Sequence, residues 1–181
     1  TNKHKKIKIG NHGEPTLHPL LPKMIKYARE QNVSDIIEVF TNGSKLSPDL
    51  NKAIVDAGLQ IINISLEGLS SERYLKVAGV KIDMENFIAN IKNLYDYSRT
   101  TGDLKIYIKI VNHASALKKN DKTIYSMTQE EKDFFYKTFG NICDEIFIEK
   151  IVPQWAETQD EKQNQVDVTG MYGQKTVRYK K

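Results

Sequence analysis

Small, hydroxyl, amide and carboxylate residues stand at the ends of three apolar runs of the sequence. Gly13-Glu14-Pro15 follows the first run, Thr41-Asn42-Gly43 follows the second, and Ser65 and Glu67 stand at the exit of the third. A carboxylate can pair with an amine or accept hydrogen bonds from ribose hydroxyls, and a glycine lets the backbone approach a ligand closely. The set therefore suits a polar ligand that carries several hydroxyls and a positively charged group.

Two further runs end in residues that belong to the same candidate set. Lys109 lies near the end of the fourth run, and Ile151 and Val152 end the fifth, just before Pro153. Residue type and spacing leave a purely structural role open for each of these residues. Thr-Asn-Gly, for example, is also an ordinary turn.

The elements that position these residues alternate between strand-like and helix-like patterns. Five short runs rich in β-branched residues are separated by stretches with apolar residues at helical spacing, which predicts a β(αβ)4 order. Apolar strands that are each followed by a helix favour a parallel sheet with right-handed crossovers. The predicted strands are residues 5–10, 36–40, 60–66, 104–111 and 145–152, and the predicted helices lie within 20–28, 47–58, 83–95 and 128–140.

Two α/β architectures fit this order: an open doubly wound sheet, or an arc of a β/α barrel. In both of them ligands bind at the carboxyl ends of the strands, which is where the candidate residues stand. Several local signals support the helices, among them Ser47 and Asp83 as N-caps, Gly58 as a left-handed C-cap and a capping box that begins at Thr128. We also expect Phe134, Phe135 and Phe139 in the core.

Composition excludes several classes of protein and site. Lys and Arg number 27 against 23 Asp and Glu, a net charge of +4, which falls short of a dedicated nucleic-acid-binding surface. No apolar run approaches the roughly 18 residues of a membrane-spanning helix. The single cysteine, Cys143, excludes an intrachain disulfide and any cysteine-built zinc or iron–sulfur site made by this sequence alone.

The two ends of the sequence predict a piece of a longer polypeptide. The first residue is Thr1 rather than methionine, a strand-like run follows almost at once, and no secretory leader is present. We expect a barrel domain over residues 1–153. Residues 154–181 are polar and are expected to be a tail or the lead-in to an absent C-terminal domain.

The order of the motifs resembles the core of radical S-adenosylmethionine (SAM) enzymes, above all members with a C-terminal SPASM-type iron–sulfur domain. The resemblance runs from about Ile7 to Pro153 and implies a partial (β/α)6 TIM-like barrel, of which this sequence supplies strands two to six. Its motifs are Gly13 to Pro19, Thr41-Asn42-Gly43, Ile64 to Gly68, Glu72-Arg73-Tyr74, Gly79-Val80-Lys81, Ile108 to Val111 and Ile148 to Pro153.

The resemblance also implies a role for each candidate residue. Gly13-Glu14-Pro15 would hold the amino group of SAM through backbone carbonyls and the Glu14 carboxylate, and Thr41 and Asn42 would line the same cavity. Ser65 and Glu67 would face the ribose or the methionine carboxylate.

The remaining candidates would lie around the substrate and the adenine. Lys109 would stand at the rim near the substrate or the cofactor, and Ile151 and Val152 would flank the adenine. The sequence departs from the family pattern at Ala78, where many members have an arginine that engages SAM, and this leaves Arg73 as a substitute. His12 also stands where many members have glycine or asparagine.

In the family, a reduced [4Fe–4S] cluster cleaves SAM to a 5′-deoxyadenosyl radical, which abstracts hydrogen from a substrate. Three thiolates hold such a cluster, and this sequence lacks the Cys-x3-Cys-x2-Cys loop that supplies them. We therefore expect this chain alone to be inactive and to belong to a cytoplasmic parent enzyme. That parent would act on a peptide, a sugar or a small biosynthetic substrate, with flavodoxin or ferredoxin as electron donor. The alternative is a non-catalytic, degenerate β/α module for binding or scaffolding.

Overall fold

Five parallel strands form one sheet in the computed structural model of the chain, which describes residues 3–10, 12–113 and 127–151. The strands pair in the order of the sequence, β1-β2-β3-β4-β5. They are β1 (His4–Ile9), β2 (Ser34–Thr41), β3 (Ile61–Leu66), β4 (Lys105–His113) and β5 (Glu145–Ile151). The helices are a short 3-10 turn η1 (Pro15–Leu17), α1 (Leu21–Glu30), α2 (Pro48–Asp56), α3 (Ser71–Ala78), α4 (Met84–Thr101) and α5 (Gln129–Phe139).

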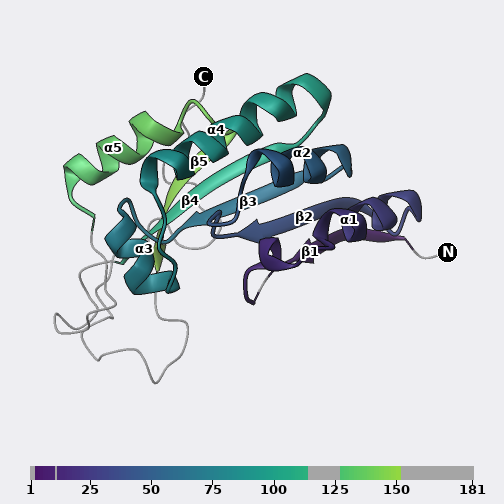
Figure 1. The fold of residues 1–181 in the computed structure, drawn as a ribbon, viewed down its shortest axis with the longest axis horizontal. Helices are drawn as coiled ribbons and strands as arrows, with labels where there is room; N and C mark the ends of the chain where they lie inside the picture. Colours follow the sequence, from purple (N-terminus) through teal and green to yellow (C-terminus); the bar gives the residue numbers. More distant parts are fainter. Residues whose placement is uncertain (1–2, 11, 114–126, 152–181) are drawn as a thin grey trace.

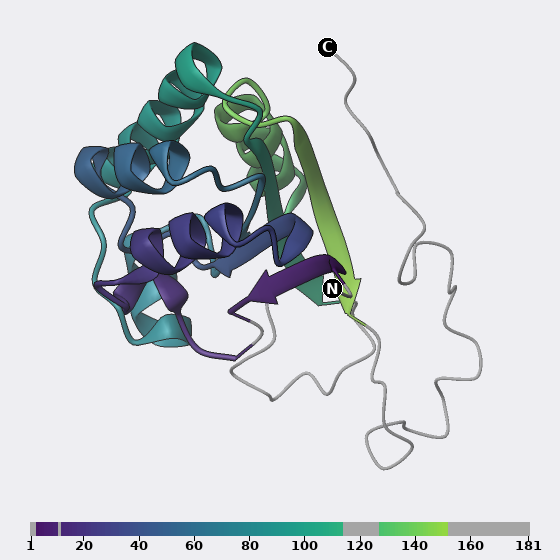
Figure 2. The same cartoon turned by 90° about the vertical axis from the view of Figure 1, so that its right-hand side faces the viewer.

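The strand order decides between the two architectures that the sequence left open. Right-handed crossovers between strands that are added in one direction place every connecting helix on the same face of the sheet. Figure 2 shows α1, α2, α4 and α5 together on one face. A doubly wound sheet would carry helices on both faces, so the arc of a β/α barrel is confirmed.

The core lies between the sheet and these helices. Leu104 directly before β4, and Ile106, Ile108 and Ile110 within it, are buried against the helices, while the residues between them point to the other face. Each such side chain contributes roughly 1.5–3 kcal/mol by leaving water. The same alternation continues on β2, β3 and β5, with Ile37, Val39, Ile62, Ile64, Leu66 and Ile146 buried.

The face opposite the helices is polar, and we call it the inner face. Glu38 on this face lies 3.1 Å from the Lys6 ammonium and accepts a hydrogen bond from the Asn63 amide at 2.7 Å. Further along, Lys109 and Glu149 form an ion pair of 2.7 Å. Charged pairs of this kind line the interior of the arc instead of a second apolar layer.

The capping signals of the sequence are confirmed. Ser47, Asp83 and Thr128 accept hydrogen bonds from backbone N–H groups in the first turns of α2, α4 and α5, and the Thr128–Glu131 capping box is complete. Gly58 takes a φ of +84°, in the left-handed region.

Two sequence-based expectations about helices need correction. Helix α3 was not predicted, because only Tyr74 of its apolar residues is buried, whereas Leu75 and Val77 are exposed and blur the helical pattern. Phe134 was expected in the core but is 42% exposed. The buried face of α5 is set by Phe135 and Phe139, four residues apart, and Phe134 lies about 100° away from Phe135 around the helix.

Candidate functional site

The Glu14 carboxylate joins the turn after β1 to the end of β2. Its Oε1 accepts hydrogen bonds from the Thr16 backbone N–H at 3.0 Å and from the Thr41 hydroxyl at 2.6 Å. Its Oε2 accepts the Asn42 backbone N–H at 2.6 Å. Glu14 also caps η1, whose first residue is Pro15. Three residues predicted for the site, Glu14, Thr41 and Asn42, are thus brought together, but the carboxylate is already engaged in holding the two turns.

The turn after β2 has little freedom. The Asn42 Oδ1 accepts the Ser44 N–H at 2.9 Å, and the Thr41 hydroxyl accepts the Gly43 N–H at 3.0 Å. Gly43 has a φ of +77°, and a Cβ there would lie 3.1 Å from the side chains of Ile64 and Phe87. Only glycine fits this position without strain.

Gly13, by contrast, stands beside open space. It is exposed, has a φ of +81°, and no described atom lies within 4 Å of the place a Cβ would occupy. No described atom therefore obstructs the turn on the side that a Cβ of Gly13 would occupy. The assignment of Gly13 to a SAM site stays a prediction.

Glu67 and Ser65 come from the end of β3 and lie close to charged groups of neighbouring elements. Burial raises the pKa of the Glu67 carboxyl, and the Glu14 carboxylate raises it further. The positive charges of Arg73 and Lys109 lower this pKa and so offset part of the rise. Ser65 is paired in register with Lys109 on β4. Charged groups from the ends of β1 and β4 and from helix α3 thus lie close enough to Glu67, at the end of β3, to shift its pKa.

Lys109 has a partner that the sequence analysis did not identify as a site residue. Its ammonium lies 2.7 Å from the Glu149 Oε2, and both side chains are about one quarter exposed, 24% and 26%. The signal was the alternation in β5, where Ile146 and Ile148 belong to the apolar face and Glu149 to the inner face. The sequence analysis instead used the last residues of the strand.

The adenine contacts expected from the last strand are not described by the structure. Ile151 is the final residue of β5, and its side chain, like the whole of Val152, lies outside the described residues. Residues 154–181 also lie outside them, so the expected division at residue 153 remains a proposal.

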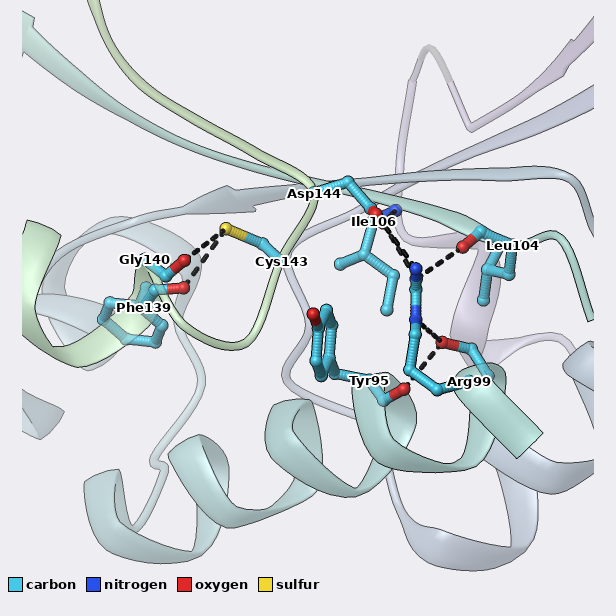
Figure 3. A network of polar contacts seen from close by, with 9 residues as sticks. Tyr95, Arg99, Leu104, Ile106, Phe139, Gly140, Cys143 and Asp144 are labelled. Atoms are coloured by element: carbon cyan, nitrogen blue, oxygen red, sulfur yellow. Dashed lines mark hydrogen bonds and ion pairs between the residues drawn. The ribbon is translucent and has the colours of Figure 1, made fainter. Parts of the chain in front are cut away.

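The residues of this chain do not fit an iron–sulfur cluster. Cys143 is buried directly before β5, and its Sγ lies 3.1 Å from the Phe139 carbonyl oxygen, to which the thiol donates (Figure 3). This is the amino end of the sheet, whereas Glu14 and Glu67 stand at the carboxyl ends. Among the described residues, no three His, Cys, Asp or Glu side chains form a metal-binding group.

Comparison with protein families gives a match over most of the chain. Residues 5–131 match the radical SAM superfamily. A probable GTP 3′,8-cyclase from Metallosphaera sedula is 44% identical over 80 residues, which are 44% of this chain and 24% of that protein. A probable GTP 3′,8-cyclase from Methanocaldococcus jannaschii is 38% identical over 96 residues, 53% of this chain and 31% of that protein. The chain thus spans well under two thirds of the length of these relatives.

Solved structures share the fold at low sequence identity. SuiB of Streptococcus suis bound to S-adenosylmethionine superposes with a TM-score of 0.55 and 15% identity, covering 82% of this chain and 30% of that chain. Coproporphyrinogen III oxidase (HemN) from Escherichia coli, a radical SAM enzyme, superposes with a TM-score of 0.53 and 11% identity, covering 82% and 32%. Within the part of the chain that the structure describes, no helix is both long and apolar enough to span a bilayer.

Proposed function

Because the chain belongs to the radical SAM superfamily, a family of enzymes that use SAM and a [4Fe–4S] cluster, we propose that it forms the SAM-binding part of such an enzyme. The observation that carries the proposal is the Glu14 carboxylate, which locks the turns after β1 and β2 into one rim at the carboxyl ends of the strands. When bound, SAM and the reduced cluster supply a 5′-deoxyadenosyl radical for hydrogen abstraction. The cluster cysteines come from polypeptide outside this sequence, so the chain alone is inactive.

The backbone of the Gly13-Glu14-Pro15 turn binds the SAM ammonium in this proposal. A carbonyl oxygen accepts hydrogen bonds from an ammonium group without needing a charge of its own. The open space beside Gly13 supports this assignment, as does the use of both Glu14 oxygens within the protein. Glu14 then acts by holding the turns after β1 and β2 together, and the main contacts with the SAM ammonium come from backbone carbonyls rather than from the Glu14 carboxylate.

Glu67, Ser65 and Lys109 bind the remaining polar groups of SAM. The Glu67 carboxylate and the Ser65 hydroxyl accept hydrogen bonds from the ribose hydroxyls, and Lys109 attracts the methionine carboxylate or an acidic group of the substrate. The half-buried position of Glu67 beside Lys109 supports this division, because each charge is partly shielded from water and acts more strongly there. Ile151 and Val152 flank the adenine.

The substrate is a polar small molecule or a peptide segment on the inner face. The charged pairs Lys6–Glu38 and Lys109–Glu149 make this face suitable for a polar substrate. Relatives are named GTP 3′,8-cyclase, and SuiB has been solved with its precursor peptide SuiA, so both substrate classes occur among similar proteins. A flavodoxin- or ferredoxin-type donor supplies the electron in the parent enzyme, which we place in the cytoplasm.

Calorimetric titration of the chain with SAM tests the proposal. Wild-type protein should bind SAM. Glu14→Gln should weaken binding about tenfold or more, because the amide NH2 group would replace a carboxylate oxygen that accepts hydrogen bonds, and a donor would then face the donors of the two turns. Glu30→Gln is the matched control, since Glu30 lies on the exposed surface of α1 with only a 3.8 Å ion pair to Lys26. Absence of SAM binding by a folded wild-type chain would favour the degenerate, non-catalytic module.

A further inference from the structure

Helix α3 carries a fully buried tyrosine over the carboxyl ends of the strands. The helix begins after the N-cap Ser70 and ends at Gly79, whose φ of +67° stops it. Figure 1 shows α3 at the end of the sheet away from the N-terminus, which is the end where the strands finish. Tyr74 is 0% exposed, whereas its neighbours Leu75 and Val77 face outward.

The Tyr74 hydroxyl connects helix α3 to the end of β2. It donates a hydrogen bond of 3.1 Å to the Asn42 carbonyl oxygen after β2. Tyr74 also lies near the Glu67 carboxylate after β3, whose charge helps to raise the pKa of the phenol. Since the Asn42 N–H is held by Glu14 at 2.6 Å, the Asn42 residue is fixed at its N–H by Glu14 and at its carbonyl by Tyr74.

The ring of Tyr74 has a separate packing role. It lies 5.2 Å from the Phe87 ring, centroid to centroid and tilted by 57°, and Phe87 in turn packs against Gly43. Phenylalanine at position 74 would keep this packing and remove only the hydroxyl. The contribution of the hydroxyl can therefore be measured apart from that of the ring.

We propose that Tyr74 is a positioning residue for SAM, whose hydroxyl holds the rim residue Asn42 in place at the end of β2. This inference rests on the proposed SAM site and assigns α3 a role in it. Asn42 is bonded at both of its backbone groups, at its N–H by Glu14 and at its carbonyl by Tyr74, and two such bonds fix the orientation of the turn after β2. Without this hydroxyl, the Asn42 carbonyl loses a buried partner, and the turn after β2 is free to move relative to α3.

The electrostatics of Tyr74 agree with this geometry. Burial raises the pKa of the phenol; the nearby Glu67 backbone counteracts part of the rise, and the carboxylates of Glu67 and Glu14 add to it. The hydroxyl therefore keeps its proton at neutral pH and remains a donor to Asn42.

The test is SAM titration of the chain with Tyr74→Phe, combined with thermal unfolding and amide hydrogen exchange. The matched control is Tyr97→Phe, which removes a hydroxyl on the exposed surface that bonds Asp56 and Lys52. We expect Tyr74→Phe to weaken SAM binding about fivefold or more and to speed exchange at the Asn42 and Gly43 amides. Tyr97→Phe should bind SAM as the wild type does.

Each outcome either supports or overturns the inference. Weaker SAM binding in Tyr74→Phe alone, with faster exchange at the rim, supports it. If Tyr74→Phe kept its SAM affinity but had a lower melting temperature, the hydroxyl would only stabilise the fold. If both SAM affinity and amide exchange were unchanged, the hydroxyl would have no role in positioning the site. If the folded wild-type chain does not bind SAM, both the proposed function and the positioning role are wrong. The wild-type titration distinguishes this case from a failure of the positioning role alone.

Discussion

The Arg99 guanidinium and the Asp144 carboxylate form a two-point ion pair at the amino end of β4 and β5. Its two hydrogen bonds are 3.0 Å and 2.9 Å long (Figure 3). Arg99 also donates to the Leu104 carbonyl at 2.8 Å, and Asp144 accepts the Ile106 N–H at 2.8 Å. The pair thus connects the last turn of α4 to the starts of two strands, at the end of the sheet opposite the candidate site.

Replacing Asp144 should lower stability without changing SAM binding. Asp144→Asn removes the charge that holds Arg99 and weakens the bond to Ile106, and we expect a loss of about 2 kcal/mol in the free energy of unfolding. Urea denaturation measures the loss. Asp96→Asn is the control, because its ion pair with Lys92 is exposed and joins neighbouring turns of one helix, so it should cost about 0.5 kcal/mol or less. Equal losses in the two variants would contradict the prediction.

A methyl group at Gly43 should disturb the rim as well as the backbone. Gly43→Ala meets both a φ of +77° and contacts of 3.1 Å to Ile64 and Phe87, so we expect a loss of about 2–3 kcal/mol. Gly79→Ala serves as the control, since its φ is +67° and no described atom lies within 4 Å of the new Cβ; its loss should stay near 1 kcal/mol. Chemical denaturation gives both values. If Gly79→Ala lost as much free energy of unfolding as Gly43→Ala, the contacts with Ile64 and Phe87 would contribute nothing to the loss at Gly43.

Much of the fold follows from short-range patterns in the sequence, and the site follows only in part. Alternation on strands and caps on helices depend on neighbouring residues, so Ser47, Asp83 and Thr128 could be identified directly. Helix α3 was missed because its one buried residue, Tyr74, makes its contacts with residues distant in the sequence.

The candidate site shows the same limit. Glu14 was placed at the rim by its motif, yet its binding to Thr41 and Asn42 links residues 27 and 28 positions apart. The partner of Lys109, Glu149, is 40 positions away and depends on the register of two strands. Sequence patterns predict which residues reach the rim, whereas strand register and crossover geometry decide which of them touch.

Glu67 should make the stability of the chain depend on pH. Burial raises its pKa in the folded state, so the folded chain binds the proton more tightly than the unfolded chain does, and stability falls as pH rises from the ordinary glutamate pKa through the folded value. Glu67→Gln cannot ionise, so its stability relative to wild type should increase from pH 4 to pH 7. Urea denaturation at the two pH values tests this, with Glu30→Gln as the exposed control. A constant difference between Glu67→Gln and wild type would overturn the prediction.

The Lys109–Glu149 pair should show energetic coupling between its two side chains. Because both are about three quarters buried and 2.7 Å apart, removing one leaves the other charge partly buried without its partner, so the two single losses together exceed the loss on removing both. We expect Lys109→Met and Glu149→Gln to lose about 1–2 kcal/mol each and the double variant to lose less than their sum by about 1 kcal/mol. A double-mutant cycle in urea measures the coupling, and the exposed pair Lys26–Glu30, 3.8 Å apart, provides a matched cycle with almost none. Additive losses at Lys109 and Glu149 would contradict the prediction and would mean that water screens the pair. Lys109 could then bind an acidic group of SAM or substrate without losing a stabilising interaction with Glu149.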